Sequence, residues 1–140
     1  MVLFFSILFS CAATALSTEP RQEAPESKIL RELFRLRNEG KPDSAEHYYA
    51  DTVLVYMKTL RNIPKQTITK LDRAFFKNHP KNKFEMTSSI DLSTKNGIVT
   101  AIFVGKEYLD GTSFKYEKIE IRFDRKGKIN YFRAYNIKGS

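Results

Sequence analysis

The sequence has few of the residues that build metal centres and disulfide frameworks. Its 140 residues include one cysteine and two histidines, His47 and His79. Because a zinc site needs several cysteine, histidine or carboxylate ligands held together, we expect no metal site. The chain also lacks a phosphate-binding glycine loop and the G-x-S-x-G motif. We therefore expect no cofactor.

Charge is missing from the start of the chain, where Glu19 is the first charged side chain. An apolar run followed by small residues is typical of a secretory signal peptide, and Ala15-Leu16-Ser17 offers a cleavage site. The run is too short to span a membrane, which needs roughly 20 apolar residues. We predict a signal peptide over 1–17, a polar linker over 18–26, one domain over 27–140, and a secreted, extracellular protein.

The single cysteine lies inside the predicted signal peptide. Leu8-Phe9-Ser10-Cys11 loosely resembles a lipobox, so lipidation of Cys11 is an alternative. If the peptide is removed after residue 17, the mature chain has no disulfide and depends on a hydrophobic core for its stability. The 11 phenylalanines and 7 tyrosines can supply much of that core.

Acidic residues are the minority among the charged ones. The chain has 24 lysines and arginines against 16 aspartates and glutamates, for a net charge of +8. This balance favours solubility and weak attraction to anionic surfaces. The basic run over 77–83 is interpreted as a solvated loop, with an acidic glycan or a lipid headgroup as the alternative partner. We expect no nucleic-acid partner.

Apolar residues with helical spacing predict three helices. The first begins at Ser27, ends before Asn38-Glu39-Gly40, and carries a stripe of Ile29, Leu30, Leu33, Phe34 and Leu36. The second is short and runs from residue 43 or 44 to about 51. The third carries Ile68, Leu71 and Phe75 and ends at 78–80.

Strand patterns occupy most of the rest of the chain. Residues 52–57 are rich in β-branched side chains, and a loop with Asn62 and Pro64 follows them. Segments 83–93, 97–109, 113–123 and 128–137 are separated by glycine-containing turns. This order predicts an α+β fold with three N-terminal helices packed on a curved antiparallel β-sheet.

The order of these elements resembles the NTF2-like (SnoaL-like) superfamily, whose domains are cone-shaped. The resemblance covers residues 27–137 and is carried by Tyr49-Ala50-Asp51, Val104-Gly105, Asp110-Gly111 and IEIRFDRKGKINYFRAYN over 119–136. It implies the fold and no particular activity, because this superfamily includes both enzymes and non-enzymes.

Ketosteroid isomerase, an enzyme of this fold, needs a carboxylate base, a tyrosine and a protonated aspartate. The resemblance places the base at Met57 or Lys58, the tyrosine at Leu33 and the aspartate at Ile119. None of these side chains can perform the step. The chain is therefore not expected to be an isomerase of that type.

Other polar residues near the helix–strand joint have two interpretations. We interpret Asp51 as a capping or turn carboxylate rather than a base. His47 with Asp91 and Tyr56 could support proton transfer, although no spacing ties these residues together. A packed, hydrogen-bonded His47 is the preferred interpretation.

Strand alternation assigns residues to the two faces of the sheet. One face, together with two helix residues and Tyr56 as a polar rim, is expected to line a narrow, largely filled apolar cavity, with a completely filled cone as the alternative. Its candidate lining residues are Phe34, Tyr56, Phe75, Ile119, Ile121, Phe123, Phe132, Ala134 and Asn136. The opposite face groups Tyr131, Arg133 and Tyr135, which suits a homodimer interface.

Three functions are compatible with this sequence. The favoured one is a secreted, non-catalytic domain that binds a small apolar ligand or a protein partner. The second is a small isomerase, dehydratase or hydrolase of an unrecognised type in the same cone. The third is a basic binder of acidic glycans or lipid headgroups.

Overall fold

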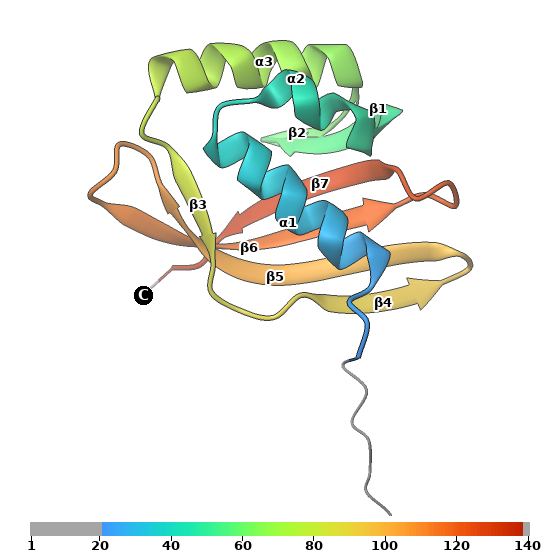
Figure 1. The fold of residues 1–140 in the computed structure, drawn as a ribbon. Coiled ribbons are helices and arrows are strands. Elements are labelled where there is room, and N and C mark those ends of the chain that lie inside the picture. Colours follow the sequence, from blue (N-terminus) through green and yellow to red (C-terminus); the bar gives the residue numbers. More distant parts are fainter. Residues whose placement is uncertain (1–20, 139–140) are drawn as a thin grey trace, which may run out of the picture.

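The computed structural model describes residues 21–138, which form three helices, a 3₁₀ helix and seven strands (Figure 1). The helices are α1 (Pro25–Asn38), α2 (Pro42–Ala45), the 3₁₀ helix η1 (Glu46–Tyr48) and α3 (Lys65–Asn78). The strands are β1 (Tyr49–Met57), β2 (Thr59–Pro64), β3 (Lys83–Met86), β4 (Asp91–Lys95), β5 (Ile98–Tyr108), β6 (Phe114–Phe123) and β7 (Ile129–Asn136). The predicted signal peptide, with Cys11, lies outside the described residues.

All seven strands belong to one sheet, in the order β2-β1-β7-β6-β5-β3, with β4 also paired to β5. The pair formed by β1 and β7 is parallel, and the other pairs are antiparallel. The prediction of an antiparallel sheet was therefore wrong for the pair of β1 and β7. The reason is that β7, the last strand of the meander, returns beside β1 from a distant part of the chain.

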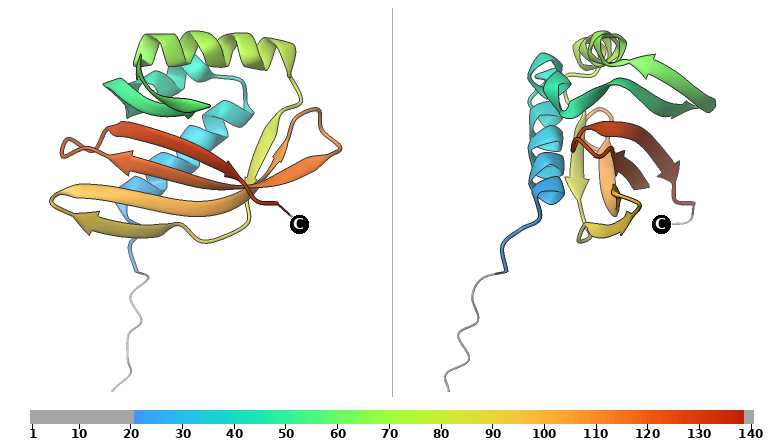
Figure 2. Two further views of the ribbon diagram at one scale, coloured as in Figure 1. Left: turned by 180° about the vertical axis from the view of Figure 1, so that it is seen from behind. Right: turned by 90° about the vertical axis from the view of Figure 1, so that its right-hand side faces the viewer.

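The helices cover one face of the curved sheet, and the other face carries no helix in the described part of the chain (Figure 2). Helix α1 crosses the helix-covered face, and α3 lies near β1 and β2. The strands β1 and β2 precede α3, so the three helices are not consecutive elements. The two helices and the sheet enclose the space in which both the core and the candidate site lie.

The core forms where α1 meets the middle of the sheet. The Phe34 ring lies 4.7 Å from the Phe84 ring and 5.5 Å from the Phe103 ring, measured between centroids. Strand β6 contributes Ile119, Ile121 and Phe123, all almost fully buried. Phe132 and Ala134 of β7 pack against the same cluster. These strand residues therefore lie on the helix-covered side of the sheet.

Three predicted elements differ from the observed ones. The second helix ends at η1, and Asp51 lies within β1 instead of closing a helix. Residues 59–64, expected to form a loop, form β2, because Lys58 adopts a positive φ of 65° and turns the chain back onto β1. The segment 83–93 forms two strands, β3 and β4, which pair with successive parts of the long β5.

Gly105 of the Val104-Gly105 pair has a packing role. A Cβ atom at this position would overlap the Phe84 ring and the Glu85 carbonyl oxygen of the neighbouring β3. The missing side chain is therefore what lets β3 approach β5 and lets Phe84 reach the core.

Candidate functional site

A cleft of about 450 Å³ opens between α3 and strands β1, β2 and β7. This volume falls in the range of small-molecule sites, about 300–1,000 Å³. The side chains that line the cleft divide into an apolar wall and a charged end. The wall consists of Val53, Val55, Met57, Ile63, Ile68, Leu71, Phe75 and Phe132, and the charged end of Arg37, Tyr49, Asp72 and Glu107.

The apolar wall runs from the core to the surface. Val53 and Ile63 are buried at its inner side, whereas Met57 and Leu71 are 43% and 46% exposed. Exposed large apolar residues at the rim of a concave site leave an apolar surface available to a ligand. The wall exists because β1 and β2 form a hairpin whose inward side chains face the apolar side of α3.

The charged end is organised by an ion pair between two helices. The Nη1 atom of Arg37, in the last turn of α1, lies 2.6 Å from Oδ2 of Asp72 in the middle of α3. The two side chains are only 23% and 16% exposed. The Arg37 guanidinium also lies 5.4 Å from the centroid of the Phe76 ring. Partial burial and these contacts fix the guanidinium in one orientation.

Burial shifts the pKa values of these groups. It raises the pKa of Asp72, although the Arg37 charge opposes this shift. Burial also raises the pKa of Tyr49, so its hydroxyl keeps its proton at neutral pH. For Arg37, burial favours the neutral form, but Asp72 and Tyr49 outweigh it and the pKa is raised. The cleft therefore contains a permanent cation, a carboxylate and a neutral phenol.

Glu107 of β5 brings a second carboxylate to the charged end. Its Oε2 atom lies 3.1 Å from Nζ of Lys115, and its Oε1 atom accepts a hydrogen bond of 3.3 Å from Nδ2 of Asn82. Lys115 also lies 2.8 Å from Glu117. Lys115 thus forms ion pairs with both Glu107 and Glu117.

Two of the nine predicted lining residues, Phe75 and Phe132, line this cleft. The others lie elsewhere. Phe34, Ile119, Ile121, Phe123 and Ala134 belong to the core or pack against it. Asn136 is exposed at the end of β7. Tyr56 is 39% exposed and stacks with Arg133, which is on the face without helices, so it is not the polar rim of the cleft.

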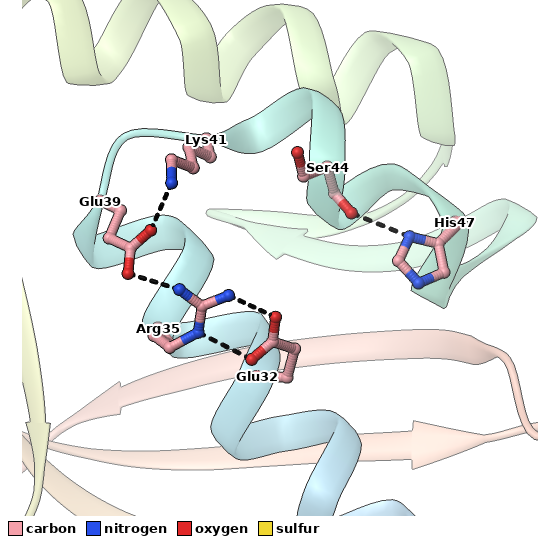
Figure 3. A network of polar contacts seen from close by, with 6 residues as sticks. All are labelled: Glu32, Arg35, Glu39, Lys41, Ser44 and His47. Carbon is pink, nitrogen blue, oxygen red and sulfur yellow. Dashed lines mark hydrogen bonds and ion pairs between the residues drawn. The ribbon is translucent and has the colours of Figure 1, made fainter.

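The proton-transfer candidates are not brought together. His47 is exposed, and its Nδ1 atom lies 2.8 Å from the carbonyl oxygen of Ser44 (Figure 3). Its ring also stacks on that of Tyr48, with the ring centroids 3.9 Å apart. Asp91 begins β4, which is separated from β1 by β5, β6 and β7. At about 4.8 Å per strand, this separation is on the order of 15–20 Å. His47, Asp91 and Tyr56 therefore do not form one site.

A surface network lies near His47. Arg35 bridges Glu32 and Glu39, and Lys41 pairs with Glu39 at 2.7 Å (Figure 3). Asp51 is a separate exposed group, with a side chain that is 98% exposed and lies 3.2 Å from Lys65. These contacts are surface ion pairs of small energy. Asp51 at the helix–strand joint is thus neither a buried base nor a helix cap.

Arg37, Tyr49 and Asp72 were not among the site residues predicted from the sequence. A signal was present, because Asp72 stands between Ile68 and Phe75 on the apolar stripe of its helix, at spacings of four and three residues. A charged residue on the buried side of a helix needs a partner. Arg37, on the core-facing side of the first helix, was the corresponding signal for the partner of Asp72.

The face of the sheet without helices carries a row of stacked cations and rings. The Arg133 guanidinium lies 4.1 Å from the centroid of Tyr56 and 4.3 Å from that of Tyr135. Arg122 lies 4.2 Å from the centroid of Tyr131. The predicted dimer-face residues Tyr131, Arg133 and Tyr135 therefore share this face, which we call the outer face.

A second hollow of about 370 Å³, near the C-terminal ends of α1 and α3, is also lined by Arg37. Lys77, Pro80 and Asn82 of the basic segment line it, together with Arg73, which pairs with Asp43.

In residues 21–138 no group of three or more histidine, cysteine or acidic side chains could hold a metal ion. Within the same residues, no helix is both long enough and apolar enough to cross a membrane.

No family model and no curated protein matches this chain. Solved structures do match it. A protein with a cystatin-like fold from Caulobacter vibrioides shares 14% identity, with a TM-score of 0.67 over 79% of this chain and 86% of that one. An NTF2-like protein with a cystatin-like fold from Novosphingobium aromaticivorans shares 12% identity, with a TM-score of 0.60 over 81% and 80%.

An NTF2-like protein from Anabaena variabilis aligns over most of both chains, 86% of this one and 97% of that one, with 12% identity and a TM-score of 0.56. At such low identities the likeness concerns the fold, and activity does not follow from it. Together with the mixed curved sheet and the helices on one face, these matches show that the chain has the NTF2-like, cystatin-like fold.

Proposed function

We propose that this protein is a secreted, non-catalytic NTF2-like domain that binds a small apolar ligand in the cleft between α3 and strands β1, β2 and β7. The cleft itself carries the proposal. It combines an adequate volume with a wall of eight apolar side chains and a few polar side chains grouped around Arg37. Sites for small molecules have this composition, with an apolar lining and a few polar groups that orient the ligand.

A neutral apolar dye, Nile red, tests the proposal. The purified chain should increase the fluorescence of the dye, and the Ile68→Trp variant should reduce its affinity at least about ten-fold, because the indole fills the cleft. Leu109→Trp is the matched control, since it adds similar bulk at a residue that is 43% exposed and lies outside the cleft. Circular dichroism checks that both variants fold. Equal dye affinity in the two variants would contradict the proposal.

A mass spectrum of organic extracts from the purified protein provides a second test. The extract of the wild-type protein should contain an apolar small molecule, and the extract of the Ile68→Trp variant should contain less of it per mole of protein. This measurement also identifies the bound molecule.

The second candidate function is a small isomerase, dehydratase or hydrolase, and Asp72 is the observation that favours it. A carboxyl group beside an apolar cleft with a raised pKa has the properties of a general base. We favour binding because Arg37 already holds the Oδ2 oxygen of Asp72 at 2.6 Å. Turnover of an apolar carbonyl compound or ester that disappears in Asp72→Asn would support catalysis instead.

The proposal of secretion rests on the uncharged, apolar start of the chain. The secreted form is expected to begin near Thr18 and to carry no lipid. N-terminal analysis of the protein recovered from both the culture medium and the membrane fraction tests this expectation. A modified Cys11 at the first position would establish lipidation instead.

A further inference from the structure

The charges around the cleft define which polar group its ligand carries. Arg37 is the only cation among the lining residues of the cleft, and Asp72 and Glu107 are both carboxylates. Lys115 adds one positive charge behind Glu107, but it also pairs with Glu117. The lining residues therefore include one cation and two carboxylates, which leaves the lining with one excess negative charge.

This count argues against an acidic ligand. Arg37 is engaged by Asp72 at 2.6 Å and is not a free cation for a ligand carboxylate. A ligand carboxylate would enter a partly buried site beside two like charges and would lose its water in doing so. A cationic ligand would meet the guanidinium at the same place.

A neutral hydroxyl group fits the charged end. Arg37 binds the Oδ2 oxygen of Asp72, which leaves the Oδ1 oxygen as an acceptor for a ligand O–H. The Tyr49 phenol, kept protonated by burial, is a donor at the same end of the cleft. A hydroxyl group both donates and accepts, so it can satisfy both partners at once. A ketone or an ester could accept from Tyr49 but would leave the Oδ1 oxygen of Asp72 without a donor.

We infer that the cleft selects a neutral apolar alcohol and discriminates against the carboxylic acid of the same carbon skeleton. This inference rests on the proposed function and names its ligand class. The apolar wall of β1, β2 and α3 binds the hydrocarbon part, and the charged end binds the hydroxyl.

Octyl alcohol and octanoate test the selectivity, because they share a chain length and differ in the head group. Their dissociation constants are measured by displacement of Nile red from the full mature chain at neutral pH. The alcohol should bind at least about ten-fold more tightly than the acid. Tighter or equal binding of octanoate would overturn the inference while leaving the apolar cleft intact. Displacement by neither compound would count against both the inference and the proposed function.

Two variants test the physical cause. Asp72→Asn removes the counterion of Arg37 while keeping the side-chain shape, and it should reduce or reverse the preference for the alcohol. Glu107→Gln removes the other carboxylate without leaving Arg37 unpaired, so it serves if Asp72→Asn fails to fold. It should also improve octanoate binding relative to the alcohol. Glu85→Gln, which removes an exposed carboxylate from β3, is the control and should leave the ratio unchanged. An unchanged ratio in Glu107→Gln would overturn the charge argument.

Discussion

The side-chain amide of Asn38 exchanges two hydrogen bonds with the main chain of Phe84. Its Nδ2 atom donates to the Phe84 carbonyl oxygen at 2.9 Å, and its Oδ1 atom accepts from the Phe84 N–H at 2.8 Å. Asn38 is the last residue of α1, and Phe84 lies in β3 at the edge of the sheet. One amide thus pairs with the edge strand as a neighbouring strand would, and it ties α1 to the sheet.

Asn38→Ala should lower the free energy of unfolding by about 1–3 kcal/mol, because it leaves two main-chain groups of Phe84 without partners. Urea denaturation measures the change. Asn78→Ala, at the exposed end of α3, is the matched control and should change stability by no more than about 0.5 kcal/mol. Equal effects of the two variants would show that the paired hydrogen bonds do not stabilise the fold.

Ile119→Asp should destabilise the fold by about 3–5 kcal/mol, since the side chain is 2% exposed and a carboxylate there would have no partner. Thermal or urea unfolding provides the measurement. Ile137→Asp makes the same change at a residue that is 41% exposed and should have little effect. A melting temperature for Ile119→Asp equal to that of the wild type would mean that position 119 is solvated.

Glu117 should make stability depend on pH. Burial raises the pKa of this carboxyl above its ordinary value of 4.5, despite the pairing with Lys115. The native state therefore binds a proton more readily than the unfolded state. As pH rises from about 4.5 through the raised native pKa, the wild type should lose stability relative to Glu117→Gln. Urea unfolding of both proteins across this range measures the difference, and Glu85→Gln controls for the loss of one charge.

The outer face should form a homodimer interface. Its tyrosines and arginines are residue types enriched at interfaces, and the Nε atom of Arg133 is buried without a hydrogen-bond partner among the described residues. Light scattering at micromolar concentration should give a dimer mass for the wild type and a monomer mass for Arg133→Glu. Lys126→Glu, in an exposed turn, makes the same charge change and should remain dimeric. A monomeric wild type would contradict the prediction.

Local patterns in the sequence predicted much of the fold. The stripe of Leu30, Leu33 and Phe34 and the alternation of Ile119, Ile121 and Phe123 report which side of a helix or strand is buried, because apolar side chains avoid water whatever the partner. The same patterns could not predict β2. Its residues have no strong alternation, and the strand forms because the turn at Lys58 brings them beside β1.

The sequence by itself determined α1, α3 and the long strands β5, β6 and β7, since these depend on periodicity over a few neighbouring residues. The tertiary structure alone decided the candidate site. Arg37 and Asp72 lie 35 residues apart on different helices, and although each stands on the apolar side of its helix, no local pattern shows that the two meet. They form a partly buried pair only in the folded chain, where α3 packs over the β1–β2 hairpin and comes close to the end of α1. The cleft beside this pair likewise combines distant segments, because β1 pairs with β7 from the other end of the chain.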